Sequence, residues 1–134
     1  MPTRLDMIGL FVKDLAGMVA FYRDVLGLDI NWDGNGPYAE FQNAGIRFSM
    51  YQRDLLPQLL GQEPAYPYGL NGTFELAIDL PFFEDVDREF ERTTRAGAHP
   101  VYHPRNESWG MRSSMIADPE GNLIEIGSWG KGNA

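Results

Sequence analysis

Residues 5–12, LDMIGLFV, and residues 74–80, FELAIDL, decide the fold, because the same pattern occurs twice in the chain. In each stretch one set of apolar side chains alternates with a second set, which predicts a β-strand. Ile8, Leu10 and Val12 form the apolar set of the first stretch. Both stretches are therefore expected to begin equivalent structural units.

A helix-forming stretch follows each of these strands. Residues 15–26 place apolar side chains at steps of three and four, with Asp14 positioned as an N-cap and Gly27 as a left-handed C-cap. Residues 84–96 form a charged, helix-favouring run that ends at Gly97. The two helices are predicted to cover one face of each sheet.

Three short strands are predicted after each helix. They are 28–32, 38–42 and 46–52 in the first half and 98–102, 112–117 and 122–128 in the second. The chain is thus one α+β domain, 1–134, made of two β-α-β-β-β modules, about 5–53 and about 73–129. A connection rich in proline and glycine, about 54–72, joins them. Two units are too few for a solenoid, so the modules must pack on each other. The alternative is two unrelated α+β segments.

Composition restricts the partners. The chain has 134 residues, no cysteine and a net charge of −8. Disulfides, thiolate metal sites and cysteine nucleophiles are excluded. A nucleic acid needs a basic face, and an anionic membrane attracts one, so neither partner is expected. A cationic ligand is compatible with this charge. No secretory signal or apolar run of about 20 residues is visible, and a cytoplasmic protein is expected.

Two motifs carry a resemblance to a known family. They are 7–15, MIGLFVKDL, continued by Phe-Tyr at 21–22 and Val-Leu-Gly at 25–27, and 117–126, ADPEGNLIEI, with Trp109-Gly110 upstream. Together they resemble the vicinal oxygen chelate superfamily of glyoxalases, bleomycin resistance proteins and extradiol dioxygenases. The resemblance implies that each module curls a mixed sheet into half of a cup that holds a small organic molecule, often in a homodimer. It implies no single reaction.

Metal-using members of that superfamily place one ligand on the first strand and one on the last strand of each module. Aligning the two modules puts the equivalent positions at Met7, Ser49, Glu75 and Glu125. A thioether and a neutral hydroxyl are poor ligands for Zn, Ni, Fe or Mn. The two histidines, His99 and His103, fall at none of these positions. We therefore expect no cofactor and no metal site, with a divalent metal as the alternative.

Glu75 and Glu125 are the candidate catalytic residues, because two carboxylates in an apolar cup raise each other's pKa and one can then act as an acid or base. The alternatives are a solvated edge-strand carboxylate for Glu75 and an inherited motif residue for Glu125. Arg47 and Arg112 are candidates to bind a ligand carboxylate, or else they pair with neighbouring acids. The remaining candidate ligand-binding residues are Met7, Phe11, Trp32, Tyr38, Ser49, Tyr51, Tyr102 and Trp109, with Met111 and Met115 as adaptable filler; core packing and dimer contacts are the alternative for the aromatic ones.

Three functions are compatible with these residues. The first, which we favour, is a small-molecule-binding protein like the bleomycin resistance proteins, whose ligand is cationic or aromatic. The second is a metal-dependent lyase, isomerase or extradiol-type dioxygenase, against which the missing imidazoles argue. The third is a metal-independent enzyme that uses Glu75 or Glu125 for proton transfer.

Overall fold

The computed structural model describes residues 1–132. The chain divides into two compact units, Met1–Tyr66 and a second that begins at Pro67. Each unit contains one four-stranded mixed sheet and one β-α-β-β-β repeat, so the predicted α+β class and the duplication are confirmed. Within the described residues, no helix combines the length and the apolar character that a membrane span requires.

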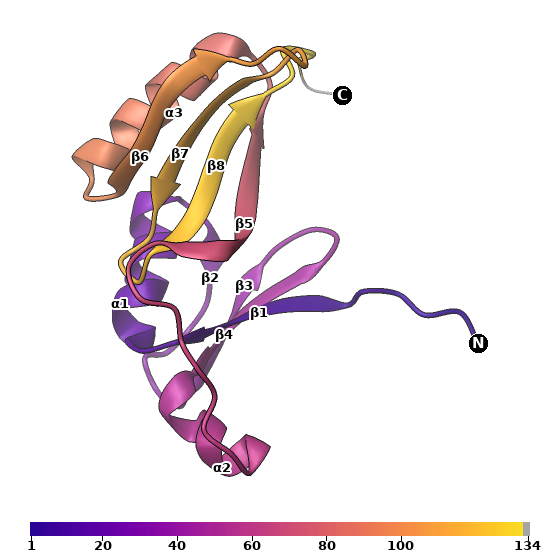
Figure 1. Cartoon of the computed structure of the whole chain (residues 1–134), viewed down its shortest axis with the longest axis vertical. Coiled ribbons are helices and arrows are strands. Elements are labelled where there is room, and N and C mark those ends of the chain that lie inside the picture. The colour runs from indigo at the N-terminus through magenta and orange to yellow at the C-terminus, as the bar shows by residue number, and fades with distance from the viewer. Residues whose placement is uncertain (133–134) are drawn as a thin grey trace. The chain divides into compact units, whose positions relative to one another are not determined.

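The first unit has its first and last strands side by side (Figure 1). Its sheet has the order β1-β4-β3-β2, in which β1 and β4 are parallel and the other pairs antiparallel. The elements are β1 (Met7–Val12), α1 (Leu15–Ala20) continued by a π-helical segment (Phe21–Val25), β2 (Asp29–Ile30), β3 (Tyr38–Gln42), β4 (Arg47–Gln52), a 3₁₀ turn (Arg53–Leu55) and α2 (Leu56–Leu60).

The α1 helix forms where the sequence predicts it. The Asp14 carboxylate accepts a hydrogen bond from the Gly17 N–H at 3.1 Å, which satisfies one of the free donors of the first turn. The Tyr22 ring then packs against Phe41 and Phe48 of the sheet, with ring centroids 6.0 and 5.5 Å apart. This aromatic contact fixes which face of the first sheet the helix covers.

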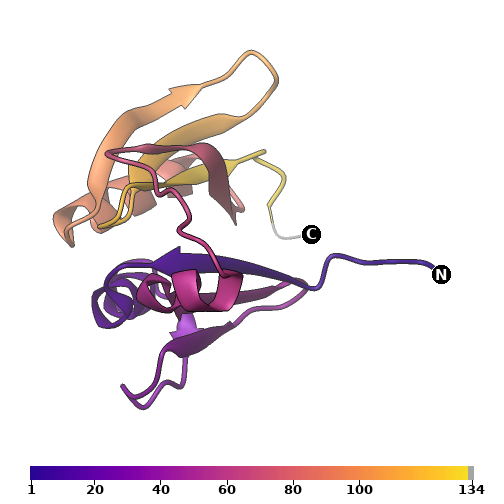
Figure 2. The ribbon, with the colours of Figure 1, turned by 60° about the horizontal axis from the view of Figure 1, so that its bottom comes forward.

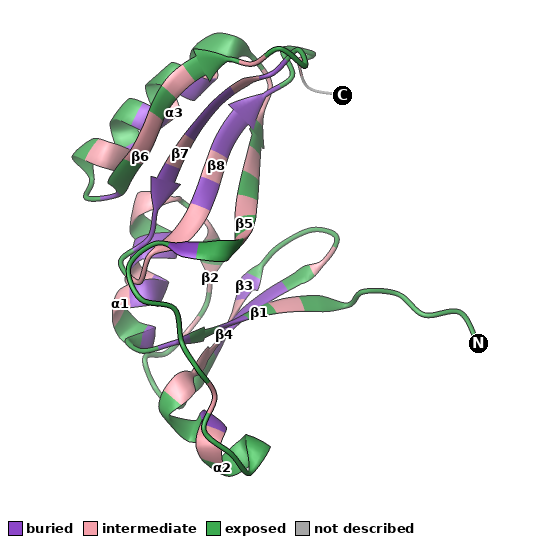
Figure 3. Cartoon of the chain, viewed as in Figure 1, coloured by how far each residue is buried: buried purple, intermediate pink, exposed green. Residues whose placement is uncertain are grey.

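The second unit repeats this plan with longer strands (Figure 2). Its sheet has the order β5-β8-β7-β6, with β5 and β8 parallel, and α3 packs on one face. The elements are β5 (Asn71–Leu80), α3 (Phe83–Arg95), β6 (His99–Asn106), β7 (Arg112–Ala117) and β8 (Asn122–Ser128). The central strands β7 and β8 are mostly buried, whereas exposed and half-buried residues alternate along most of the edge strand β5 (Figure 3).

Several element boundaries differ from the predicted ones, and three of these differences have a clear structural cause. The strand predicted at 28–32 is only Asp29–Ile30, because the Trp32 indole donates to the Asn35 carbonyl at 3.0 Å and the chain turns away. The predicted connection ends earlier than residue 72, since Asn71 N–H donates to Gly121 O at 2.8 Å and joins β5. The strand β6 continues past residue 102 to Asn106, because an edge strand tolerates the missing N–H of Pro104.

Candidate functional site

The strand register tests the equivalence of the four positions predicted from the repeat. In the first sheet Met7 pairs with Arg47, two residues before Ser49; in the second Glu75 pairs with Leu123, two residues before Glu125. The two copies therefore have the same offset, so the four positions are equivalent within the repeat. Because side chains alternate along a strand, all four lie on the face of their sheet that points away from its helix. We call these faces the first and second site faces.

The first site face holds a thioether engaged by two hydroxyl groups. Ser49 Oγ donates to Met7 Sδ at 3.3 Å, and Tyr38 Oη lies 3.7 Å from the same sulfur. The Ser49 residue is only 2% exposed, whereas Met7 and Tyr38 are partly open to solvent. Three of the predicted ligand-binding residues are thus brought together by three different strands.

An ion-pair network borders this cluster. The Arg47 guanidinium donates to both oxygens of Glu40, at 2.7 and 3.0 Å, and to Asp6 at 2.8 Å. The hydrogen bonds from Arg47 and then Tyr38 lower the pKa of Glu40 to about 2, and the bond to Glu40 raises the pKa of Tyr38. The alternative predicted for Arg47, pairing with neighbouring acids, is the arrangement observed.

The sequence interpretation missed Glu40 and Asp6. The signal for Glu40 was present, since it alternates with Tyr38 on β3 and therefore shares the site face. No comparable periodicity points to Asp6, which precedes β1.

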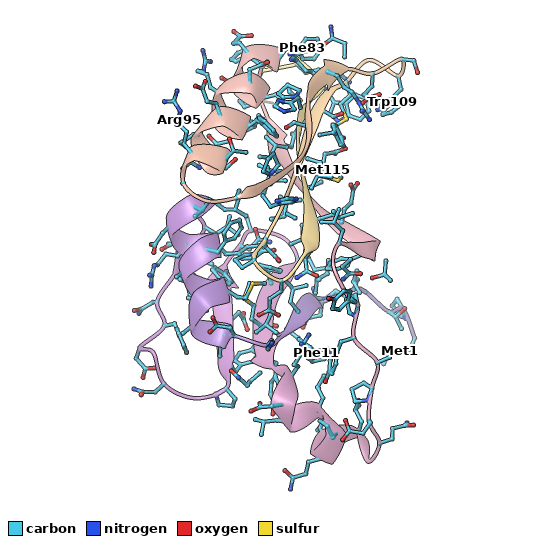
Figure 4. All side chains as sticks on the ribbon, turned by 60° about the vertical axis from the view of Figure 1, so that its left-hand side comes forward. Met1, Phe11, Phe83, Arg95, Trp109 and Met115 are labelled. Atoms are coloured by element: carbon cyan, nitrogen blue, oxygen red, sulfur yellow. The ribbon has the colours of Figure 1, made fainter. Side chains whose placement is uncertain are left out.

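Aromatic side chains extend the first site face toward the ends of β1 and β4. The rings of Phe11 and Tyr51 meet edge to face, with centroids 6.4 Å apart, and Phe11 is 55% exposed (Figure 4). In contrast, Trp32 lies in the loop after β2, where its indole holds the turn described above. The exposed apolar surface on this face thus comes from strand residues.

The second site face carries the two candidate catalytic carboxylates on adjacent strands. Glu75 is exposed on the edge strand β5, and Glu125 is half-buried on β8. Burial, then the charges of Glu75 and Glu107, raise the pKa of Glu125 above its ordinary value. Among the described residues neither Glu75 nor Glu125 forms an ion pair with a cation.

A third carboxylate, Glu107, was not foreseen. It accepts hydrogen bonds from Arg105 at 2.7 Å and from Ser113 at 2.9 Å, and its side chain is 12% exposed. The Tyr102 hydroxyl donates to Ser113 Oγ at 3.1 Å, and the Arg105 guanidinium lies over the Tyr102 ring. The hydrogen bonds from Arg105 and Ser113 lower the pKa of Glu107. Because Glu107 lies in the loop after β6, no strand periodicity could have pointed to it.

Two methionines border the carboxylates. Met115 pairs with Glu125 across strands β7 and β8. The buried Met111 places its terminal methyl group over Gly127, where a Cβ atom would overlap it. The loop between β6 and β7 also exposes Trp109, which is 60% accessible (Figure 4). The predicted filler role of Met111 and Met115 is compatible with these positions.

The alternative predicted for Arg112, pairing with a neighbouring acid, is also the arrangement observed. Its guanidinium donates to both oxygens of Asp87 on α3, at 2.7 Å each, so it lies on the helix side of the sheet. The strand alternation explains this, because Ser113 and not Arg112 shares the side of Glu125. His103 is likewise near α3, with its ring 5.1 Å from that of Phe90. Neither Arg112 nor His103 lies on the second site face.

The comparisons with known proteins agree with this geometry. The sequence profile of the Glyoxalase/Bleomycin resistance protein/Dioxygenase superfamily matches residues 4–126. The chain belongs to this superfamily. Its relatives include the protein YraH of Bacillus subtilis (strain 168), 32% identical over 92% of this chain and 96% of that protein. Another is the Mycobacterium tuberculosis protein Rv0887c (strain ATCC 25618 / H37Rv), 33% identical over 88% of this chain and 70% of that protein.

Solved structures of the superfamily share the fold. A glyoxalase/bleomycin resistance protein/dioxygenase from Nocardioides superposes with a TM-score of 0.80 at 22% identity, covering 99% of this chain and 87% of that one. A lactoylglutathione lyase from Agrobacterium tumefaciens gives a TM-score of 0.68 at 26% identity, covering 95% of this chain and 94% of that one. The superfamily contains enzymes and binding proteins, so the fold alone does not choose between them.

The donor set at Met7, Ser49, Glu75 and Glu125 does not fit a transition metal. Met7 Sδ is engaged by two hydroxyl groups, and Ser49 supplies only a neutral oxygen. No group of three His, Cys, Asp or Glu side chains with the arrangement of a metal site occurs in the part of the chain that the structure describes. Two carboxylates without an imidazole match the preferences of hard ions, which bind by charge and need further oxygen ligands.

Proposed function

We propose that this protein binds a small organic molecule on its second site face without a resident transition metal. The observation that carries the proposal is the pair Glu75 and Glu125, two carboxylates on neighbouring strands with no cation partner in residues 1–132. Strand spacing puts their Cα atoms roughly 8 Å apart, a distance that one cationic group can bridge. The ligand class is therefore a small cationic, aromatic molecule.

The other features of the site faces support this class. Phe11, Tyr38 and Met7 expose apolar surface on the first site face, and on the second the Tyr102 hydroxyl donates to Ser113, a hydrogen-bond partner of Glu107. Aromatic rings and thioethers provide adaptable contacts for a flat ligand, and rings also attract a cation through their π faces. The net charge of −8 adds a long-range attraction for a cation.

Calorimetric titration with benzylamine and with benzyl alcohol tests the proposal, because the two probes differ mainly in charge at neutral pH. We expect benzylamine to bind more tightly. Glu125→Gln is expected to weaken the binding of benzylamine about tenfold, because one charge-assisted hydrogen bond is lost. Glu84→Gln, which removes the same charge from exposed helix surface, is the matched control. Equal binding of the two probes, or equal effects of the two substitutions, would contradict the proposal.

Elemental analysis of protein purified without chelator tests the metal-free part separately. We expect no stoichiometric Ni, Zn, Fe or Mn. Stoichiometric metal would instead favour the metal-dependent lyase, isomerase or dioxygenase alternative.

A metal-independent enzyme is the second candidate, favoured by the raised pKa of Glu125 beside Glu75. A carboxyl group that stays protonated closer to neutral pH can donate a proton to a bound ligand. Turnover by metal-free protein that Glu125→Gln abolishes would favour this candidate over simple binding.

We further propose a cytoplasmic homodimer, as the superfamily resemblance suggests. Light scattering during gel filtration measures its mass, for which twice 15.1 kDa is expected. A monomeric mass at micromolar concentration would contradict this part of the proposal.

A further inference from the structure

Within the described residues, Arg53 is the one arginine without a carboxylate partner. Every other arginine of the chain forms an ion pair. Among residues 1–132, by contrast, no carboxylate oxygen lies within 4.0 Å of a nitrogen of Arg53. In a chain of net charge −8, an unpaired and half-buried guanidinium is an exception that needs a physical account.

The backbone brings Arg53 to the carboxyl edge of two parallel strands. Val12 at the end of β1 pairs with Gln52 at the end of β4, so the residues that follow, Lys13 and Arg53, lie at the same edge. Gln52 Nε2 donates to the Lys13 carbonyl at 3.2 Å and ties the two chain segments together. This edge is where parallel strands in open α/β sheets commonly present ligand-binding residues.

An open pocket of about 250 Å³ lies at this edge. Its lining includes Lys13 and Arg53, the carboxylates Asp54 and Glu63, and the ring of Tyr66. All of these residues belong to the first unit. The pocket therefore offers both signs of charge around an aromatic wall.

Tyr66 holds the Arg53 side chain in place. The Tyr66 hydroxyl donates to the Arg53 carbonyl at 3.1 Å, and its ring lies under the guanidinium with the central carbon 4.3 Å from the ring centroid. Stacking uses the π face of the guanidinium and leaves its N–H edge available. That edge matches the two oxygens of a carboxylate.

We propose that this pocket binds a small zwitterion, with its carboxylate on Arg53 and its ammonium group toward Asp54 and Glu63. The two acids in the lining disfavour a dianion such as phosphate, because a like charge nearby raises the cost of binding it. The site uses none of the residues of the two site faces. It therefore stands or falls independently of the proposed function.

Titration followed by ¹H–¹⁵N NMR of the full chain tests this subsite. The probes are 4-aminobutyrate, butyrate, butylamine and inorganic phosphate, a series that separates the zwitterion from each of its charges. We expect a saturable shift of the Arg53 Nε–H signal with 4-aminobutyrate, weaker binding of butyrate, and no Arg53 shift with butylamine or phosphate. Butyrate or phosphate binding as tightly as 4-aminobutyrate would overturn the proposal, as would no shift at all.

Substitutions then assign the contact. Arg53→Gln is expected to weaken the binding of 4-aminobutyrate about tenfold or more, because a charge-assisted bidentate contact is lost. Tyr66→Leu is expected to weaken it a few-fold, roughly the worth of one exposed cation–π contact. Arg95→Gln is the control, because Arg95 is exposed near the end of α3 and pairs with Glu91 (Figure 4). Backbone amide shifts report the binding in each variant and show that it remains folded. Unchanged binding in Arg53→Gln would overturn the assignment.

Discussion

Gly121 and Gly45 occupy equivalent positions of the repeat, four residues before Glu125 and Ser49, and the pair provides a matched test of the packing around the motif at 117–126. Both have left-handed backbone conformations, with φ of +89° and +86°. A Cβ atom on Gly45 would meet nothing within 4 Å. On Gly121 it would overlap the Gly69 carbonyl oxygen and come 3.1 Å from the Gly69 carbonyl carbon. The same substitution therefore costs strain alone at one position and strain plus overlap at the other.

The expected magnitudes follow from these two contributions. Left-handed strain for alanine is about 1–2 kcal/mol, partly offset by about 0.4–1 kcal/mol because alanine restricts the unfolded chain. Gly45→Ala should thus lose about 1 kcal/mol of unfolding free energy. Gly121→Ala should lose about 1–3 kcal/mol more, the usual cost of forcing a methyl group against packed atoms. Because the added methyl group meets a backbone atom, the segments that precede β5 and β8 must shift to relieve the overlap.

Urea denaturation followed by circular dichroism measures both losses at one pH and temperature. With an unfolding entropy of about 2.1 cal/mol/K per residue, the extra loss corresponds to a melting-temperature decrease of about 3–10 °C beyond that of Gly45→Ala. Equal losses for the two variants would refute the argument, since the contact with Gly69 would then contribute nothing. A larger loss for Gly45→Ala would refute it as well.

Three further predictions use the site and the core. The pKa of Glu125 is higher in the folded protein than in the unfolded chain. Ionised Glu125 therefore destabilises the fold at a pH above its folded-state pKa, and this loss is absent at a pH below its unfolded-state pKa. In urea titrations Glu125→Gln should therefore have a higher unfolding free energy than the unsubstituted protein at pH 7, and the difference should disappear near pH 4. A lower unfolding free energy of the variant at pH 7 would count against the reasoning. Arg47→Gln should move the pKa of Glu40 upward from about 2, as followed by carboxyl ¹³C NMR, and an unmoved pKa would show that Arg47 is not its cause. Phe90→Ala should cost about 3–5 kcal/mol in urea denaturation because this side chain of α3 is buried, and a cost below about 1 kcal/mol would contradict that packing.

The sequence predicted the repeat well because its signals are local and occur twice. Alternation located β7 and β8 at their observed bounds, and Asp14 caps α1 as its position suggested. The offset between Met7 and Ser49 could be transferred to Glu75 and Glu125 because both pairs depend on the same parallel register.

The side-chain partners were harder to predict, because they depend on loops and on which face a residue takes. For Arg112 both a ligand contact and an ion pair were left open, although its alternation with Ser113 already separates it from the side of Glu125. Glu107 reaches the second site face from a loop. Arg53 differs from the other arginines only in having no carboxylate partner among the described residues. Such features depend on three-dimensional distances that periodicity does not encode.

The duplication within one chain has a consequence for how this protein can change. In a symmetric dimer of half-length chains, one substitution would appear on both sheets at once. In this chain each sheet is encoded by its own stretch of sequence. The equivalent positions therefore hold neutral side chains in the first sheet, Met7 and Ser49, and acidic ones in the second, Glu75 and Glu125. The neutral pair is bordered by the Arg47 ion pairs, and the carboxylate pair lies near Glu107. The chemistry of one sheet can therefore change without any change in the other.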